Sequence, residues 1–271
     1  MGEISWLQAL ILGIIQGLTE FLPISSSGHL AIAEAVMGIN GDNLTFAIAV
    51  HAATVLSILT VFGLEIWKLI QGLFKFQWND ETQYIAKLLL SIIPVAIVGV
   101  FFKGYVESIF DSHYILIWVA FMMLLTAALL LISYYTKYCH RRNITFNDAF
   151  FIGIAQAIAS VFPGLSRSGT TIAAGIIMGN KKDKVAQFSF LMVIIPVLGE
   201  AFLDLKKGNF SFAQSGISPI SLLIGFLSAY IVGTLTCKWM LDIVRNGKLF
   251  YFAFYCIAVA AIILGFLLFV P

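Results

Sequence analysis

Charged residues are scarce in this chain of 271 residues: Asp, Glu, Lys and Arg make up 11% of it, whereas hydrophobic residues make up 60%. A soluble domain carries roughly 25% charged and 45–50% apolar residues. The shortage of charge excludes a soluble globular protein, because this much apolar surface cannot be hidden from water. The composition therefore predicts an integral membrane protein.

Cysteine is also rare, and the three that occur, Cys139, Cys237 and Cys256, have no paired spacing. A disulfide framework and a cysteine metal motif are therefore not expected. The chain has no Walker loop, no Rossmann glycine pattern and no HExxH sequence. The first residues include Glu3 and no Lys or Arg, so we expect no cleavable signal peptide.

Long apolar runs dominate what remains. A membrane-spanning helix needs about 20 consecutive apolar residues. Six segments reach or approach that length: 46–66, 84–102, 114–135, 186–203, 218–236 and 250–270. We expect six full spans that share one bundle.

Four shorter apolar segments form two pairs, each broken at a proline, Pro23 or Pro163. The pairs are 4–22 with 28–39, and 148–162 with 170–179. No single member is long enough to cross, so each pair is interpreted as a re-entrant hairpin of two half-helices. Irregular backbone is tolerated at membrane depth only where protein buries it or a cavity hydrates it.

The two hairpins resemble each other in sequence. GIIQGLTEFLPISSSGHL (13–30) matches GIAQAIASVFPGLSRSGTT (153–171), and FAIAVHAATVL (46–56) matches FSFLMVIIPVL (188–198). Each half then holds one hairpin and three spans, an odd number, so the second half enters from the opposite side. We predict an all-α membrane protein forming one domain, 1–271, of two inverted repeats, 1–140 and 141–271.

The basic residues support one orientation. If the first residue lies on side A, side A holds only Lys103, Lys206 and Lys207. Side B holds the others outside the hairpins: Lys68, Lys75, Lys87, Lys137, Arg141, Arg142, Lys181, Lys182, Lys184, Lys238, Arg245 and Lys248. Side B is then cytoplasmic by the positive-inside rule. Both termini are expected outside, and the two hairpin tips can meet within the membrane.

The second hairpin has the chemistry of an anion site. In PGLSRSGTT, we expect free N–H groups from Gly164 to Gly169 and a half-helix from Thr170 onward, which together attract an anion. Arg167 adds a planar fork of donors suited to phosphate. Further hydroxyl donors are supplied by Ser166, Ser168, Thr170 and Thr171. The alternative is that the hydroxyls only cap the helix while Arg167 snorkels toward the interface.

The first hairpin carries catalytic residue types. Gln16 and Glu20 are four apart on one helix face, and Ser26 and His29 are three apart on the next. A serine, an imidazole and a carboxylate fit a nucleophile, a proton shuttle and a metal or orienting ligand. The alternative is a buried polar cluster that only holds the hairpin closed. Because carboxylates in hydrocarbon are costly, function is favoured.

Three further polar residues are weaker candidates. His51 could act as an outer donor near the site, although a lone His on an apolar helix is more often satisfied by a neighbour. Glu34 and Glu200 lie near the outer ends of their helices, where an interfacial position is the simpler interpretation.

These motifs resemble the undecaprenyl-pyrophosphate phosphatase family of the bacitracin-resistance type. QGLTEFLPISSSGHL (16–30) resembles the family's (E/Q)xxxE sequence followed by a PxSSxGH box, and PGLSRSGTT (163–171) resembles its PGxSRSxxT motif. SFLMVIIPVLG (189–199) is similar to a later stretch of the family. The resemblance covers essentially the whole chain and implies inverted repeats with re-entrant hairpins.

The resemblance also implies roles for particular residues. It makes Glu20, Ser26, His29 and Arg167 catalytic, with Gln16 and Glu20 as ligands of a divalent cation, Mg²⁺ or Ca²⁺. It implies phosphate binding by Ser25, Ser27, Gln156, Ser166, Ser168 and Thr171. Gln16 stands where many members have Glu, so Glu20 is the only carboxylate of the box. Glu200 replaces a residue that is small in many members.

The implied reaction removes the terminal phosphate of undecaprenyl pyrophosphate in the bacterial plasma membrane, for cell-wall synthesis and bacitracin resistance. Ser26 activated by His29, His29 itself, or water could attack the phosphate. A lipid flippase or secondary transporter is the competing prediction, because inverted repeats with broken helices are also a transporter architecture. A homodimer is a further expectation.

Overall fold

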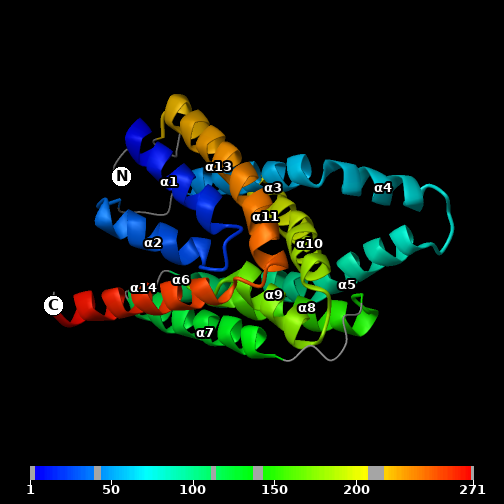
Figure 1. The fold of residues 1–271 in the computed structure, drawn as a ribbon. Helices are drawn as coiled ribbons and strands as arrows, with labels where there is room; N and C mark the ends of the chain where they lie inside the picture. Colours follow the sequence, from blue (N-terminus) through cyan, green and yellow to red (C-terminus); the bar gives the residue numbers. More distant parts are fainter. Residues whose placement is uncertain (1–3, 40–43, 111–113, 137–142, 207–216, 270–271) are drawn as a thin grey trace.

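The computed structural model describes residues 4–39, 44–110, 114–136, 143–206 and 217–269. Over these residues the protein is entirely helical, with no strand (Figure 1). The helices are α1 (Trp6–Thr19), α2 (Ser26–Val36), α3 (Leu44–Val61), α4 (Gly63–Leu73), α5 (Asp80–Phe101), α6 (Lys103–Phe110), α7 (Ile115–Tyr135), α8 (Phe146–Val161), α9 (Arg167–Ile177), α10 (Lys182–Met192), α11 (Ile194–Lys206), α13 (Pro219–Arg245) and α14 (Phe250–Phe269).

Six helical segments are long and apolar enough to cross a membrane, as the hydropathy predicts. They are 44–61, 80–101, 115–135, 182–203, 219–245 and 250–268. The predicted first span ran on to residue 66, but the helix breaks between Val61 and Gly63 before continuing as α4. The fifth extends nine residues further than predicted, because α13 continues beyond the apolar stretch through Lys238 to Arg245.

The two broken segments are pairs of short helices, as predicted. α1 and α2 are joined by residues 20–25, and α8 and α9 by residues 162–166, so neither member reaches the length of a span. We call these two links connection 1 and connection 2. Capping boxes start both first members: Ser5 pairs with Gln8 in α1, and Thr145 pairs with Asp148 in α8.

Contacts between the halves of the chain hold the bundle together. α1 packs along α13, and α8 packs along α5, while α7 and α14 lie side by side (Figure 1). Gly13 of α1 faces Gly225 and Ser228 so closely that an added Cβ would overlap both. Gly153 of α8 lies in the same way against the backbone of Ser91. Small residues of this kind let membrane helices approach closely.

Apolar side chains of the hydrophobic core pack against the connections. Phe21, in connection 1, is 1% exposed and meets Phe190 of α10 edge-on, with ring centroids 5.5 Å apart. Phe62 packs against Phe190 as well. This aromatic group fixes the backbone next to Glu20, so the polar residues of connection 1 are held on a rigid apolar support.

The two ends of the bundle hold different helix ends. The beginning of α1 and the end of α14 lie toward the same end of the molecule, whereas α4 and the start of α5 project from the opposite end (Figure 1). The described residues do not include Lys137, Arg141 and Arg142, on which the predicted orientation partly rests. The predicted boundary between the repeats, at 140 and 141, also lies outside them.

Candidate functional site

Connection 1 and connection 2 meet at an ion pair between Glu20 and Arg167. Both partners are largely removed from solvent, with the side chain of Glu20 6% exposed and that of Arg167 23% exposed. The prediction that the two hairpin tips meet is therefore confirmed. An ion pair buried in an apolar bundle is costly to desolvate, which makes it a candidate for function rather than for stability alone.

The carboxylate of Glu20 is the centre of the site. Its Oε1 accepts from Nη2 of Arg167. Its Oε2 accepts from the Ser26 hydroxyl at 2.7 Å and from the Gln16 side-chain amide at 3.0 Å. One carboxylate thus binds a potential nucleophile and a potential phosphate ligand at the same time.

The hydroxyl of Ser26 donates to Glu20 and not to His29 in this structure, so activation of Ser26 by His29 stays a prediction. Ser26 and His29 do lie three apart on α2, as the spacing indicated. Both ring nitrogens of His29 have other partners, however. Nδ1 lies 2.8 Å from the carbonyl oxygen of Ser25, and Nε2 lies 2.8 Å from the hydroxyl of Tyr255.

The two connections end in the same cap. Ser25 caps α2 by accepting from the N–H of Gly28, and Ser166 caps α9 by accepting from the N–H of Gly169. Ser26 and Arg167 follow these caps as the first residues of their helices. The caps correspond at an offset of 141 residues and the prolines at 140, so connection 2 has one more residue between proline and cap. Gly164, at φ +92°, lies in this stretch.

Ser25 has a backbone conformation that is rare for a residue with a side chain, φ 70° and ψ 103°. Its hydroxyl oxygen compensates by capping α2 and lies 3.3 Å from that of Ser27. Backbone strain of this kind persists where the surrounding structure imposes it, and it gathers at functional sites. The strain here sets the direction in which Ser26 leaves the cap.

The start of α9 differs from the prediction. The helix begins at Arg167 and not at Thr170, because Ser166 supplies the cap. The expected run of free N–H groups is also shorter: that of Ser166 donates to Thr126 Oγ1 at 3.0 Å, and that of Gly169 donates to Ser166 Oγ at 3.1 Å. The first two N–H groups of α9 lack an intrahelical acceptor, as in any helix. An anion at the start of α9 would therefore have fewer free N–H donors than predicted.

Several predicted phosphate ligands are engaged with protein. Ser168 donates to the carbonyl oxygen of Leu22 at 3.1 Å, which joins the two connections a second time. The hydroxyl of Thr171 lies 2.6 Å from that of Ser189 on α10. Ser166 and Ser168 have their hydroxyls 3.3 Å apart, so these side chains form a buried network.

Four side chains in the hairpins carry buried polar atoms that have no hydrogen-bond partner among the described residues. They are Oε1 of Gln16, both side-chain polar atoms of Gln156, Nη1 of Arg167 and Oγ1 of Thr170. Unsatisfied polar groups in a protein interior call for a ligand or water. Nη1 of Arg167 is the most telling, because the second arm of the same guanidinium is already bound to Glu20.

The three weaker candidates from the sequence lie in different surroundings. His51 of α3 donates through Nδ1 to the carbonyl oxygen of Ala47 at 2.8 Å, so its own helix satisfies it. Glu34 lies in α2, beyond the two connections. The side chain of Glu200 is outside the described residues.

Sequence reasoning missed three residues of the site. Tyr255 of α14 contacts His29, Thr126 of α7 accepts from Ser166, and Ser189 of α10 contacts Thr171. Thr126 and Ser189 are polar residues in apolar spans, a signal that could have indicated them. Tyr255 stands among many aromatic residues of a span, where nothing in the sequence distinguishes it.

The side-chain oxygen atoms of Glu20 and Gln16 could supply some of the ligands of a hard cation. Within the described ranges no group of three or more His, Cys, Asp or Glu side chains could hold a metal ion. The Glu20 carboxylate and the unpartnered Oε1 of Gln16 are nevertheless oxygen donors. Mg²⁺ is often bound by one or two carboxylates together with substrate phosphates, so these residues fit a cation that is shared with a diphosphate.

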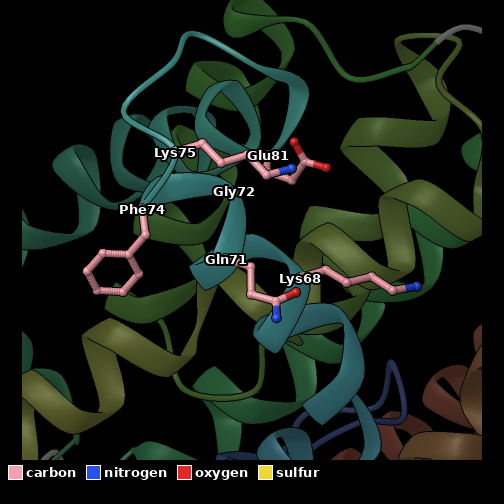
Figure 2. Close-up of a pocket in the computed structure, with 6 residues that line it drawn as sticks. All are labelled: Lys68, Gln71, Gly72, Phe74, Lys75 and Glu81. Carbon is pink, nitrogen blue, oxygen red and sulfur yellow. The ribbon is translucent and has the colours of Figure 1, made fainter.

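A surface pocket of about 550 Å³ lies elsewhere, where α4 turns into α5 (Figure 2). Its lining consists of Lys68, Gln71, Gly72, Phe74, Lys75 and Glu81. None of the predicted site residues belongs to it. The candidate site is thus a buried cluster and not this pocket.

Taken together, the spans and the cluster define a multi-pass helical membrane protein with a serine hydroxyl, a carboxylate and a guanidinium joined within the bundle, groups suited to phosphoryl chemistry. Residues 9–262 match the family described as "Bacitracin resistance protein BacA". The chain belongs to this family.

Relatives from several bacteria resemble nearly the whole chain. Proteins named undecaprenyl-diphosphatase from Bacteroides thetaiotaomicron and Parabacteroides distasonis are each 57% identical, over 93% and 96% of this chain and 95% and 97% of their own length. One of the same name from Christiangramia forsetii is 42% identical over 95% of this chain and 97% of its own length.

Proposed function

We propose that this protein hydrolyses undecaprenyl pyrophosphate to undecaprenyl phosphate and inorganic phosphate. The observation that carries the proposal is the carboxylate of Glu20, which binds the Ser26 hydroxyl and the Arg167 guanidinium on its two oxygens. The relatives that share most of the chain bear the name of this activity. A transporter needs no such pair of groups, and the relatives' name does not favour a flippase.

The substrate divides between two environments. Its long isoprenoid tail belongs in the bilayer, while its diphosphate needs polar partners at the depth of the connections. Arg167 supplies these, because Nη1 is buried and has no protein partner in the described part of the chain. A guanidinium donates along two parallel bonds to phosphate, so Arg167 can hold the terminal phosphoryl group and stabilise its charge during transfer.

The chemical step starts at Ser26. Its oxygen attacks the terminal phosphorus, its proton passes to Glu20 at 2.7 Å, and the bond from phosphorus to the bridging oxygen breaks to release undecaprenyl phosphate. Water then attacks the phosphoserine, and the Ser26 oxygen recovers the proton from Glu20. Inorganic phosphate leaves and the site returns to its starting state.

His29 serves the second half of the reaction in this scheme. Because Ser26 already has Glu20 as its proton acceptor, the imidazole is left to accept the proton of the attacking water, which it then gives up to the departing phosphate. Two other routes lead to the same products: direct attack by water, and attack by His29. They differ from the serine route in the covalent species that forms.

A divalent cation, Mg²⁺ or Ca²⁺, would be held by Glu20 and by the carbonyl oxygen of Gln16. When bound, it would neutralise charge on the diphosphate. Gln16 already orients Glu20 through its amide N–H, at 3.0 Å, and its unpartnered oxygen is the remaining donor of the pair.

The architecture we propose is a pair of inverted repeats. Reciprocal packing supports it: the first member of each hairpin, α1 or α8, packs on a span from the other half, α13 or α5. The corresponding cap hydrogen bonds of Ser25 and Ser166 support it as well. The basic loops then lie in the cytoplasm and both termini lie outside, in the plasma membrane.

This orientation suits cell-wall synthesis. A site between two tips within the membrane is open to a lipid carrier released at the outer face, and we propose that it opens in that direction. Recycling that carrier would support cell shape, and removing the diphosphate form would protect against bacitracin. A homodimer is compatible with the fold but not required by the site.

Phosphate release from undecaprenyl or farnesyl pyrophosphate tests the proposal. The purified protein in detergent should release phosphate, and a chelator should stop the release until Mg²⁺ or Ca²⁺ is restored. No membrane potential exists in detergent, so release there excludes transport as the sole activity. A folded protein that leaves both substrates intact would contradict the proposal.

A further inference from the structure

The imidazole of His29 is held at both nitrogens, and its partners fix where its proton lies. The carbonyl oxygen of Ser25, 2.8 Å from Nδ1, can only accept a hydrogen bond. Nδ1 therefore carries the proton. In the neutral ring Nε2 is then the acceptor, and the hydroxyl of Tyr255 at 2.8 Å donates to it.

Tyr255 also fixes the plane of that ring. The phenol and the imidazole stack with their centroids 5.6 Å apart and their planes at 12°. The next residue of α14, Cys256, lies with its sulfur 3.7 Å from the carbonyl oxygen of Pro23. This contact holds α14 against connection 1, so the position of Tyr255 beside His29 follows from the packing of the helix.

These contacts leave His29 one orientation. An imidazole can turn over and can exchange its proton between two nitrogens, and either change would remove the basic nitrogen from its place. The Ser25 carbonyl sets the tautomer, while the Tyr255 hydroxyl and ring hold Nε2 in direction. Tyr255 is 42% exposed, so it lies between the imidazole and the outer surface of α14.

We propose, on the basis of the phosphatase function proposed above, that Tyr255 is a positioning residue for hydrolysis. With the Ser25 carbonyl setting the Nδ1–H tautomer, Tyr255 holds Nε2 in the direction from which it accepts a proton. Tyr255 acts through His29 and needs no contact with the phosphate. Arrival of water beside the phosphorylated site replaces the Tyr255 hydroxyl as the partner of Nε2.

The variant Tyr255→Phe separates this role from simple packing, because it keeps the ring and removes only the hydroxyl. Its kcat should fall about tenfold or more, as expected when a proton acceptor loses its orientation, while KM changes by less than about twofold. The melting temperature should stay near that of the wild type. Tyr251→Phe is the matched control: Tyr251 is one turn earlier on α14, is 60% exposed, and should behave as wild type.

A double-mutant cycle tests whether Tyr255 acts through His29. In a His29→Gln background, Tyr255→Phe should cause no further loss of the residual activity. A full tenfold further loss there would overturn the proposal. Equal activity of wild type and Tyr255→Phe would overturn it as well, and so would a loss confined to KM.

A spectroscopic measurement gives a reading that does not depend on turnover. With ¹⁵N-labelled histidine, the His29 signals should show the Nδ1–H tautomer, and Tyr255→Phe should shift the Nε2 signal of His29 while sparing that of His51. An Nε2–H tautomer in the wild type would contradict the proposal. A wild type that releases no phosphate overturns the proposed function and this inference together, whereas an active wild type with a fully active Tyr255→Phe overturns the inference alone.

Discussion

Ser26 and Arg167 each begin a half-helix, and they bind opposite oxygens of one carboxylate, that of Glu20. Connection 1 supplies the carboxylate and α2 the hydroxyl, while α9 brings the guanidinium from the other hairpin. An ion pair and its bound hydroxyl in an apolar bundle are stable only while all three groups stay paired, since removing one leaves an uncompensated charge or donor. Variants at these positions therefore need a stability measurement beside each rate.

Arg167 should be indispensable to turnover. Arg167→Ala should lower kcat by about two orders of magnitude or more, the scale of losing one key donor to a transition state. Arg167→Lys should recover little, because an ammonium group lacks the planar fork that can serve Glu20 and a phosphate together. Steady-state phosphate release checks both variants, and near-wild-type activity of Arg167→Lys would refute the bidentate role.

Cation dependence should follow Glu20 more than Gln16. Glu20→Gln removes the charge, so the Mg²⁺ or Ca²⁺ concentration needed for half-maximal activity should rise far more than in Gln16→Ala. Titrations of both cations with the two variants and the wild type measure this. An unchanged titration in Glu20→Gln would leave Glu20 with the proton-transfer role alone.

The three adjacent serines should differ in effect. Ser26→Ala should abolish activity, because it removes the hydroxyl bound to Glu20. Ser25→Ala should give intermediate activity and cost about 1 kcal/mol of stability, the typical loss on removing a helix cap. Ser27→Thr should be tolerated. Rapid-quench labelling should place phosphate on Ser26, and strong activity of Ser26→Ala beside an inactive His29→Ala would assign the attack to His29 or water.

Gly13 should be intolerant of even a methyl group. A Cβ there would overlap Gly225 and Ser228 of α13, so Gly13→Ala should destabilise the protein by about 1–3 kcal/mol, the usual cost of overpacking. Gly99→Ala is the matched control, because a Cβ at Gly99 of α5 meets nothing within 4 Å. Melting temperatures in one detergent compare the two, and an equal response would show that α1 and α13 can separate freely.

Topology gives an independent prediction. In a background without Cys139, Cys237 and Cys256, a cysteine at position 271 should react with a membrane-impermeant reagent in intact cells, and one at position 140 should be protected. The reason is the cluster of basic residues at 137–142, which belongs in the cytoplasm. Labelling at 140 with protection at 271 would invert the orientation.

Hydropathy and the positions of helix-breaking prolines were enough to predict the spans and the broken helices. A bilayer sets the length of a span, and a proline ends a half-helix. The meeting of the two tips followed from charge bias and repeat symmetry, and the Glu20–Arg167 pair confirms it. The helix start at Arg167 was missed, since the prolines align one residue out of register with the caps at Ser25 and Ser166.

Side-chain direction was harder to predict than position. The spacing of Ser26 and His29 is correct for one helix face, yet Glu20 is the acceptor because connection 1 folds its carboxylate back over the start of α2. The partner of His29 comes from 226 residues further along the chain. No local pattern encodes a contact of that separation, and Tyr255 carries no mark among the aromatic residues of its span.

The most direct test measures phosphate release from undecaprenyl pyrophosphate by the wild type and by Ser26→Ala and Arg167→Ala, all in the same detergent with saturating Mg²⁺. Gly99→Ala serves as a control substitution away from the site. We expect steady release by the wild type and the control, and losses of about two orders of magnitude or more in the two site variants, measured at a temperature at which each variant is folded. Release by folded Ser26→Ala and Arg167→Ala at the wild-type rate would contradict a catalytic site built around Glu20.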